Sequence, residues 1–181
     1  MCVQLPIQLV FHYDFGMKKF LPRAAFFKSL SKKVMASGAL IFDAKGRLLM
    51  LKTTYGDGWI IPGGISEDRE SPTRTCLREV KEELGLKIKL GQLLCVDYKP
   101  PTLKNYSDDS VQFIFDGGSL TEKQIIQITL NPDEHSEFAF VPQKDALKLL
   151  HTALAERLPH CLAAIKTGRP VYLEHGKPVK F

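Results

Sequence analysis

The stretch GISEDRESPTRTCLREVKEELGL, residues 64–86, says more about the fold than any other part of the chain. Ser71 followed by Pro72 predicts a helix start, because a serine side chain can cap free backbone amides and proline is tolerated in the first turn. The helix should end at Leu84 or Gly85, since glycine readily adopts the left-handed conformation that closes helices. The segment therefore predicts one short helix with both ends marked.

This predicted helix has an apolar arc and an acidic arc. When each residue is advanced by about 100°, Glu79, Glu82 and Glu83 fall together. Such crowded charges repel one another, and a cation would relieve the repulsion; carboxylate oxygens suit Mg²⁺ or Mn²⁺. A solvated acidic face is the alternative interpretation. The arc expected to face the core consists of Cys76, Leu77, Val80 and Leu84.

The same segment resembles the signature of the Nudix hydrolases. Its defining positions are filled by Gly64, Glu70, Arg78, Glu79, Val80, Glu82, Glu83, Gly85 and Leu86. A match of this length is far more specific than a lone glycine motif. Beyond the signature, the run from about Val34 to Glu174 is similar to a bacterial Nudix type with no settled substrate. The resemblance implies an α/β fold, a Nudix-like α/β/α sandwich with a central mixed sheet.

The resemblance also implies roles for individual residues. The expected ligands of Mg²⁺ or Mn²⁺ are Glu79, Glu82, Glu83 and the backbone carbonyl of Gly63. Glu79, Glu82 and Arg78 are expected to carry catalysis. Arg78 would pair with Glu70 and so fix the orientation of the ligands, while Gly64 would allow the tight turn that precedes the helix. A bound metal would neutralise a diphosphate and activate a water.

The base that takes the proton from the attacking water stays open between two places. Glu82 or Glu79 could act from the helix, but Nudix enzymes also use a carboxylate on a downstream loop. Asp109, Glu122 and Glu134 are the downstream candidates, and the sequence does not rank them.

Contacts to the substrate are less clearly marked. Lys52 lies where the family often places a basic residue facing the phosphates, although a lysine exposed to water at a strand end would look the same. Tyr98 lies beside a loop and could stack on a base, but packing is the more common role of such a tyrosine. Pro101 falls where members acting on ADP-ribose often have proline, and a stiff turn is its ordinary explanation.

The rest of the chain alternates strands and helices without the regular unit of a doubly wound sheet. This favours a mixed sheet with helices on both faces. The expected strands are a buried hairpin of Val34–Phe42 and Arg47–Leu51, then Trp59–Ile61, Leu86–Asp97, Val111–Phe115 and Phe138–Val141. The expected C-terminal helix is Ala146–Ile165, with a break at Pro159.

Composition and charge limit the class of protein. The chain has 181 residues, 44% hydrophobic and 25% charged, which is typical of one globular domain; we expect an N-terminal extension, 1–33, and a single Nudix-like domain, 34–181. A net charge of +5 favours anionic partners. Four scattered cysteines form no C-x-x-C pair, so neither a disulfide framework nor a zinc site is expected. We find no signal peptide and no membrane span, and expect a cytoplasmic protein.

The favoured function is a divalent-metal-dependent pyrophosphohydrolase. It would cleave the phosphoanhydride bond of a nucleoside diphosphate linked to another moiety, such as an ADP-ribose-like compound or a sugar nucleotide. Alternatives are a pyrophosphohydrolase of nucleoside triphosphates or, given six basic residues in Lys18–Lys33, of RNA 5′ ends. A non-catalytic nucleotide sensor is a fourth hypothesis, disfavoured because every signature glutamate is present. A nucleic-acid partner is not favoured, and no residue points to a homodimer, although one is compatible with the sequence.

Overall fold

The computed structural model describes residues 22–56, 58–101 and 109–180. These belong to two units, residues 1–32 and residues 33–181. The first contains helix α1 (Arg23–Ser29), which follows Pro22. The predicted basic segment of Lys18–Lys33 thus lies partly outside the described residues, as do residues 102–108.

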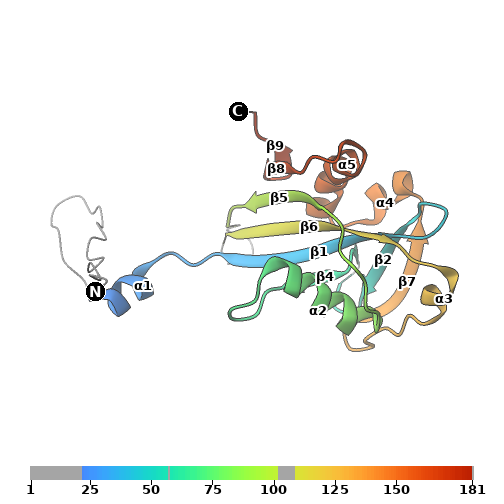
Figure 1. Ribbon diagram of the computed structural model, residues 1–181, viewed down its shortest axis with the longest axis horizontal. Helices are drawn as coiled ribbons and strands as arrows, with labels where there is room; N and C mark the ends of the chain where they lie inside the picture. The colour runs from blue at the N-terminus through green and yellow to red at the C-terminus, as the bar shows by residue number, and fades with distance from the viewer. Residues whose placement is uncertain (1–21, 57, 102–108, 181) are drawn as a thin grey trace, which may run out of the picture. The chain divides into compact units, whose positions relative to one another are not determined.

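One mixed sheet organises the second unit (Figure 1). Within the described residues its nine strands follow the order β3-β2-β1-β6-β5-β8-β9, with β4 paired to β1 and β7 paired to β2. The pairs β1–β6 and β5–β8 are parallel, and the others are antiparallel. The strands are β1 (Val34–Phe42), β2 (Leu48–Thr53), β3 (Trp59–Ile60), β4 (Gly63–Ile65), β5 (Leu93–Lys99), β6 (Ser110–Ser119), β7 (His135–Val141), β8 (Val171–Glu174) and β9 (Lys177–Pro178).

The predicted hairpin of β1 and β2 forms only next to its turn. Phe42 pairs with Leu48, and the two strands then part. The first half of β1 pairs instead with β4, where Gly38 faces Gly63, while β2 pairs with β7. This split gives β4 a place in the sheet directly before helix α2, so the glycine turn is held by β1.

Helices cover both faces of this sheet (Figure 1). Successive residues of β1 point to opposite sides: Leu40 packs in one core cluster with Leu158 of α5, and Ile41 packs in the other with Val80 of α2. The expected α/β/α sandwich is therefore confirmed. The helices of this unit are α2 (Pro72–Leu84), α3 (Glu122–Ile126), α4 (Gln143–Leu149) and α5 (Thr152–Thr167). No described helix is long and apolar enough to cross a membrane.

The strand predicted from Leu86 to Asp97 begins later in the structure than expected. Strand β5 begins at Leu93, where pairing with Phe115 of β6 begins. Leu86 is buried, and Ile88 and Leu90 pack against the α2 side of the core. The alternation of apolar residues that suggested a strand thus comes from an extended connection packed on the core outside the paired sheet.

The C-terminal helix breaks earlier than predicted. Helix α4 ends at Leu149, and Leu150 takes an extended conformation and bridges to Trp59 before α5 begins. Pro159 lies inside α5. It forfeits one backbone hydrogen bond, and the buried side chains of Leu158 and Cys161 on either side hold that part of the helix on the sheet. Helix α3 and strands β8 and β9 are too short to give a periodic signal.

Candidate active site

Helix α2 begins and ends as its sequence predicts. The Ser71 hydroxyl accepts a hydrogen bond from the Arg74 amide, and Gly85 closes the helix with a φ of 69°. Val80 and Leu84 on the inner side are fully buried. Leu77, expected on the same arc, is 39% exposed, because it lies at the margin of the arc. The packed arc fixes the rotation of the helix, which brings its glutamates against the turn before it.

That turn needs glycine at two successive positions. Gly63 has a φ of +148°, and a Cβ atom there would collide with the backbone of Ser37 and Gly38 in β1. A Cβ atom on Gly64 would lie 2.5 Å from the carboxyl carbon of Glu79. The first glycine therefore lets the chain approach β1, and the second makes room for a carboxylate.

Glu83 is the most enclosed of the helix glutamates, with 2% of its surface exposed. Its Oε2 accepts a hydrogen bond of 2.8 Å from the Gly63 amide, and its Oε1 lies 2.8 Å from Nε2 of His135. Burial raises the pKa of Glu83 to about 8; the Gly63 hydrogen bond opposes this and the neighbouring carboxylates add to it. Burial also lowers the pKa of His135, which favours the neutral form of its imidazole.

Arg78 links the other carboxylates. Its guanidinium donates two hydrogen bonds, of 3.0 and 2.9 Å, to the two oxygens of Glu70, the pair that the signature implies. The Nη1 atom also lies 2.8 Å from Glu79 and 2.9 Å from Glu82. Hydrogen bonding to Arg78 is the main reason that the pKa of Glu70 falls to about 2. One arginine thus holds three glutamates in a fixed arrangement.

The structure adds two residues to this group. Glu83, Glu134 and His135 offer ligand atoms within 4.8 Å of one another, and within the described ranges no other trio is grouped so closely. Burial raises the pKa of Glu79 as well as that of Glu83, so both carboxyl groups lie where their negative charge is unfavourable. A divalent cation would offset that cost, and these oxygen-rich donors fit one. His135 carries no sequence signal, because its contact with Glu83 arises only from the pairing of β7 with β2.

The three downstream base candidates lie in different surroundings. Glu134 belongs to the group around Glu83. Asp109 is bonded to Lys33 and to the Tyr98 hydroxyl, and Glu122 lies in the first turn of α3. Glu134 is therefore the one of the three that the fold places beside the helix carboxylates.

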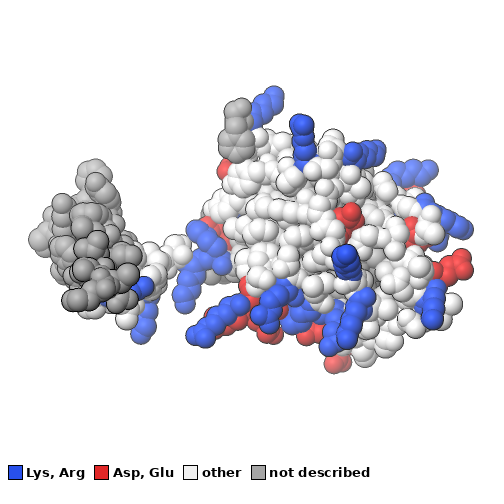
Figure 2. Space-filling view, viewed as in Figure 1, with Lys and Arg blue, Asp and Glu red and all other residues white. Residues whose placement is uncertain are grey.

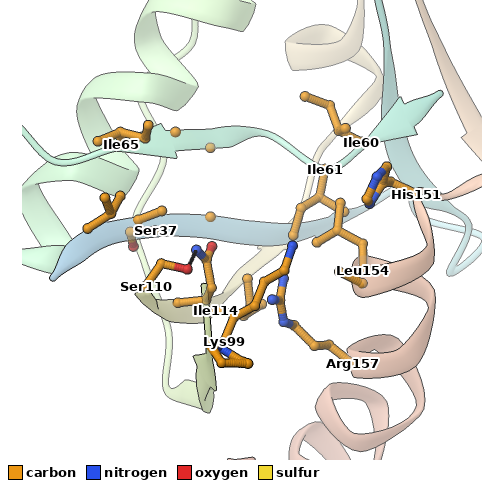
Figure 3. A pocket seen from close by; sticks show the side chains of 18 residues that line it. Ser37, Ile60, Ile61, Ile65, Lys99, Ser110, Ile114, His151, Leu154 and Arg157 are labelled. Carbon is orange, nitrogen blue, oxygen red and sulfur yellow. Dashed lines mark hydrogen bonds between the residues drawn. The ribbon is translucent and has the colours of Figure 1, made fainter. Parts of the chain in front are cut away.

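A cavity of about 450 Å³ lies beside the glycine turn (Figure 3). Gly63 and Gly64 border it, and the same two residues contact Glu83 and Glu79. Its other walls come from β1, β3, β5, β6 and the start of α5. A molecule in the cavity could therefore reach the carboxylates by passing over the turn.

The two predicted substrate contacts lie outside this cavity. Lys52 is half-buried in β2, where it pairs with Trp59 and Glu137. Tyr98 is half-buried in β5, and its hydroxyl donates a hydrogen bond of 2.9 Å to Asp109. The neighbour of Tyr98, Lys99, lines the cavity instead. Because successive strand residues face opposite sides, the sequence alone did not reveal which of the two faces the cavity.

Charge is spread over the second unit. In Figure 2, Lys and Arg lie mainly around the rim of the visible face, with Asp and Glu among them, while the middle of the face is largely uncharged. On this face there is no single broad basic patch of the kind that a nucleic acid would need.

A mixed sheet between helices, with a glycine turn leading into a helix of crowded glutamates, defines a Nudix-type domain. The family model described as NUDIX domain matches residues 32–163, and the chain belongs to this family. Hydrolysis of phosphoanhydride bonds is the activity typical of this family. All solved structures compared below share this fold.

The MutT protein from Methanosarcina mazei Go1 superposes with a TM-score of 0.63 at 25% identity, over 76% of this chain and 99% of that one. A UDP-X diphosphatase matches with a TM-score of 0.62 at 22% identity, and the match covers 86% of this chain and 77% of that one. Mouse diphosphoinositol polyphosphate phosphohydrolase 3-alpha is 51% identical over 49 residues, 27% of this chain. The match spans only 30% of that relative's length.

Proposed function

We propose that the protein is a divalent-metal-dependent pyrophosphohydrolase that cleaves a nucleoside diphosphate linked to another moiety, such as an ADP-ribose-like compound or a sugar nucleotide. The observation that carries the proposal is the position of Gly63 and Gly64. They lie against the buried carboxylate of Glu83 and the partly buried carboxylate of Glu79 on one side and border the cavity on the other. A substrate with its diphosphate over the turn would keep one end in the cavity.

In this proposal the helix glutamates bind the metal and Arg78 positions them. Glu79, Glu82, Glu83 and the Gly63 carbonyl would hold Mg²⁺ or Mn²⁺. When bound, the cation neutralises the diphosphate and makes a water more acidic. Arg78 keeps Glu79 and Glu82 in place through its bonds to both and to Glu70.

The reaction requires one proton acceptor. The water oxygen attacks one phosphorus, the bridging P–O bond breaks, and the water proton passes to a carboxylate. Glu82, which is half exposed, and Glu134 are both suitably open to solvent for this role. The products would be a nucleoside monophosphate and a phosphorylated remainder.

The names of two structural neighbours support this substrate class. One is the UDP-X diphosphatase, and another is an ADP-ribose pyrophosphatase from Streptococcus suis 89-1591, with a TM-score of 0.57 at 21% identity. Both names describe a nucleoside diphosphate joined to another group.

A substrate panel tests the proposal. Purified protein would be incubated with Mg²⁺ and ADP-ribose, nucleotide sugars, nucleoside triphosphates or 5′-triphosphorylated RNA, and the products separated by chromatography. We expect a nucleoside monophosphate from a nucleotide sugar or ADP-ribose, and no product when a chelator replaces Mg²⁺. Binding without turnover of any compound would instead support a sensor, and turnover of triphosphates alone would contradict the proposed substrate.

A further inference from the structure

One part of the cavity wall is aliphatic. Ile61 comes from the segment before the glycine turn, Ile114 comes from β6 and Leu154 comes from α5, and the three side chains belong to one core cluster (Figure 3). Among the described residues that line the cavity, none is Phe, Tyr or Trp. A polyhydroxylated sugar would leave hydroxyl groups unpaired against such a wall. A flat ring with apolar faces fits better, so the base end of the substrate belongs here.

Positive charge lies at one end of the same cavity. Lys99 from β5 and Arg157 from α5 are both directed into it (Figure 3). Arg157 is 5% exposed, and its Nε donates a hydrogen bond of 2.5 Å to buried Asp97, which also accepts one from the Gly176 amide. The guanidinium is thereby fixed and its charge balanced.

Lys99 differs from Arg157 in this respect. Within the part of the chain that the structure describes, Lys99 forms no ion pair, and no carboxylate lines the cavity. The cavity therefore carries an excess positive charge. It favours groups with negative partial charge, such as carbonyl oxygens, over groups that only donate hydrogen bonds.

One neutral side chain adds an acceptor. Gln112 lies on β6, and its amide nitrogen donates a hydrogen bond of 3.1 Å to the Ser110 hydroxyl. This leaves the amide oxygen of Gln112 to accept a hydrogen bond from a ligand. The polar end thus offers two cationic donors and one neutral acceptor.

We propose that this cavity binds a uracil base, so that the preferred substrates are uridine diphosphates linked to another moiety. This inference rests on the proposed function and names its substrate. Adenine, guanine and cytosine each carry an exocyclic amine with positive partial charge. Uracil has none: its two carbonyls flank one N–H, which matches donors on Lys99 and Arg157 and the acceptor on Gln112.

The position of the cavity also fixes which half of the substrate is selected. The uridine half is enclosed beside Gly63 and Gly64, and the other half extends past the carboxylates, beyond the cavity. The enzyme should therefore discriminate among bases more strongly than among the groups attached to the second phosphate.

The first test uses the wild-type protein and matched substrates. UDP-glucose and CDP-glucose differ only in the base: uracil has a ring carbonyl at the position where cytosine has an exocyclic amine. We expect kcat/KM for UDP-glucose to exceed that for CDP-glucose and ADP-glucose by about 30-fold or more, since a mismatched base leaves polar groups unpaired. UMP should also bind more tightly than CMP in calorimetry without metal.

The second test removes the excess positive charge. Lys99→Met should lower the UDP-glucose to CDP-glucose ratio to less than about 5-fold, mainly through KM, because one donor to the base is lost. Lys166→Met, an exposed change in the last turn of α5, should keep the wild-type ratio. Circular dichroism would verify that each variant folds. The comparison of UMP and CMP binding uses the wild-type protein alone, so it tests the uracil site even if a variant fails to fold.

Three results would overturn the inference. They are equal turnover of the nucleotide sugars, preference for an amine-bearing base, and equal binding of UMP and CMP. The first two would leave the proposed function standing, because a phosphoanhydride would still be hydrolysed. If neither ADP-ribose nor any nucleotide sugar is hydrolysed, the proposed function fails on its own, and equal binding of UMP and CMP would then refute the uracil site separately.

Discussion

The carboxylate group and the cavity are neighbours built in opposite ways. Glu70, Arg78 and the helix glutamates come from one stretch of fourteen positions, 70–83, and Arg78 contacts all of these carboxylates except that of Glu83. The cavity is lined by residues from Val34 to Arg157, drawn mainly from five strands and one helix. Local sequence thus determines the chemistry, while the packing of distant elements determines the choice of substrate. Changes in the two regions should have separable effects.

The largest effect is expected in the carboxylate group. Glu82→Gln should leave the fold intact and lower kcat by about 10²–10⁴-fold, because a metal ligand or proton acceptor is lost. The loss should be equal for every substrate, since Glu82 does not line the cavity. Steady-state kinetics on two nucleotide sugars would measure it, with Glu156→Gln on the exposed face of α5 as control. Near wild-type turnover at matched metal concentration would contradict the role of Glu82.

An intermediate effect is expected from His135, which the structure places against Glu83. His135→Ala should weaken Mn²⁺ binding by about 10–100-fold, because Glu83 loses the partner that orients it. His135→Gln, which can still donate a hydrogen bond, should recover part of that loss. Electron paramagnetic resonance of free Mn²⁺ gives the affinity. An unchanged affinity in the alanine variant would show that His135 only packs.

The smallest effect concerns stability. Glu70 has a pKa of about 2 in the folded chain against 4.5 for the free group, so its bonds to Arg78 stabilise the fold above pH 4.5 and are lost as the pH falls toward 2. Glu70→Gln should therefore lower Tm by a few degrees at neutral pH, and the difference from wild type should shrink in acid. Calorimetry at several pH values would test this. A difference that does not change with pH would contradict the ionic contribution.

The sequence predicted both ends of α2, because capping depends on the residue next to each end of the helix, Ser71 at the start and Gly85 at the end. The pairing of Arg78 with Glu70 was implied by the signature and is present. The positions of His135 beside Glu83 and of Lys99 in the cavity could not be predicted, because a strand's register and the face of each residue depend on partners far along the chain. The break between α4 and α5 likewise follows from the bridge of Leu150 to Trp59, a contact that helical periodicity does not encode.

The central claim is that the carboxylates of α2 hold the metal on which hydrolysis depends. The most direct test titrates Mn²⁺ into metal-free protein and records bound Mn²⁺ and hydrolysis of the best panel substrate in the same samples. We expect turnover to rise in parallel with occupancy in the wild-type protein, and Glu83→Gln to lose both. Hydrolysis that persists after chelation, or a Glu83→Gln variant that binds Mn²⁺ and turns over as wild type does, would contradict the claim.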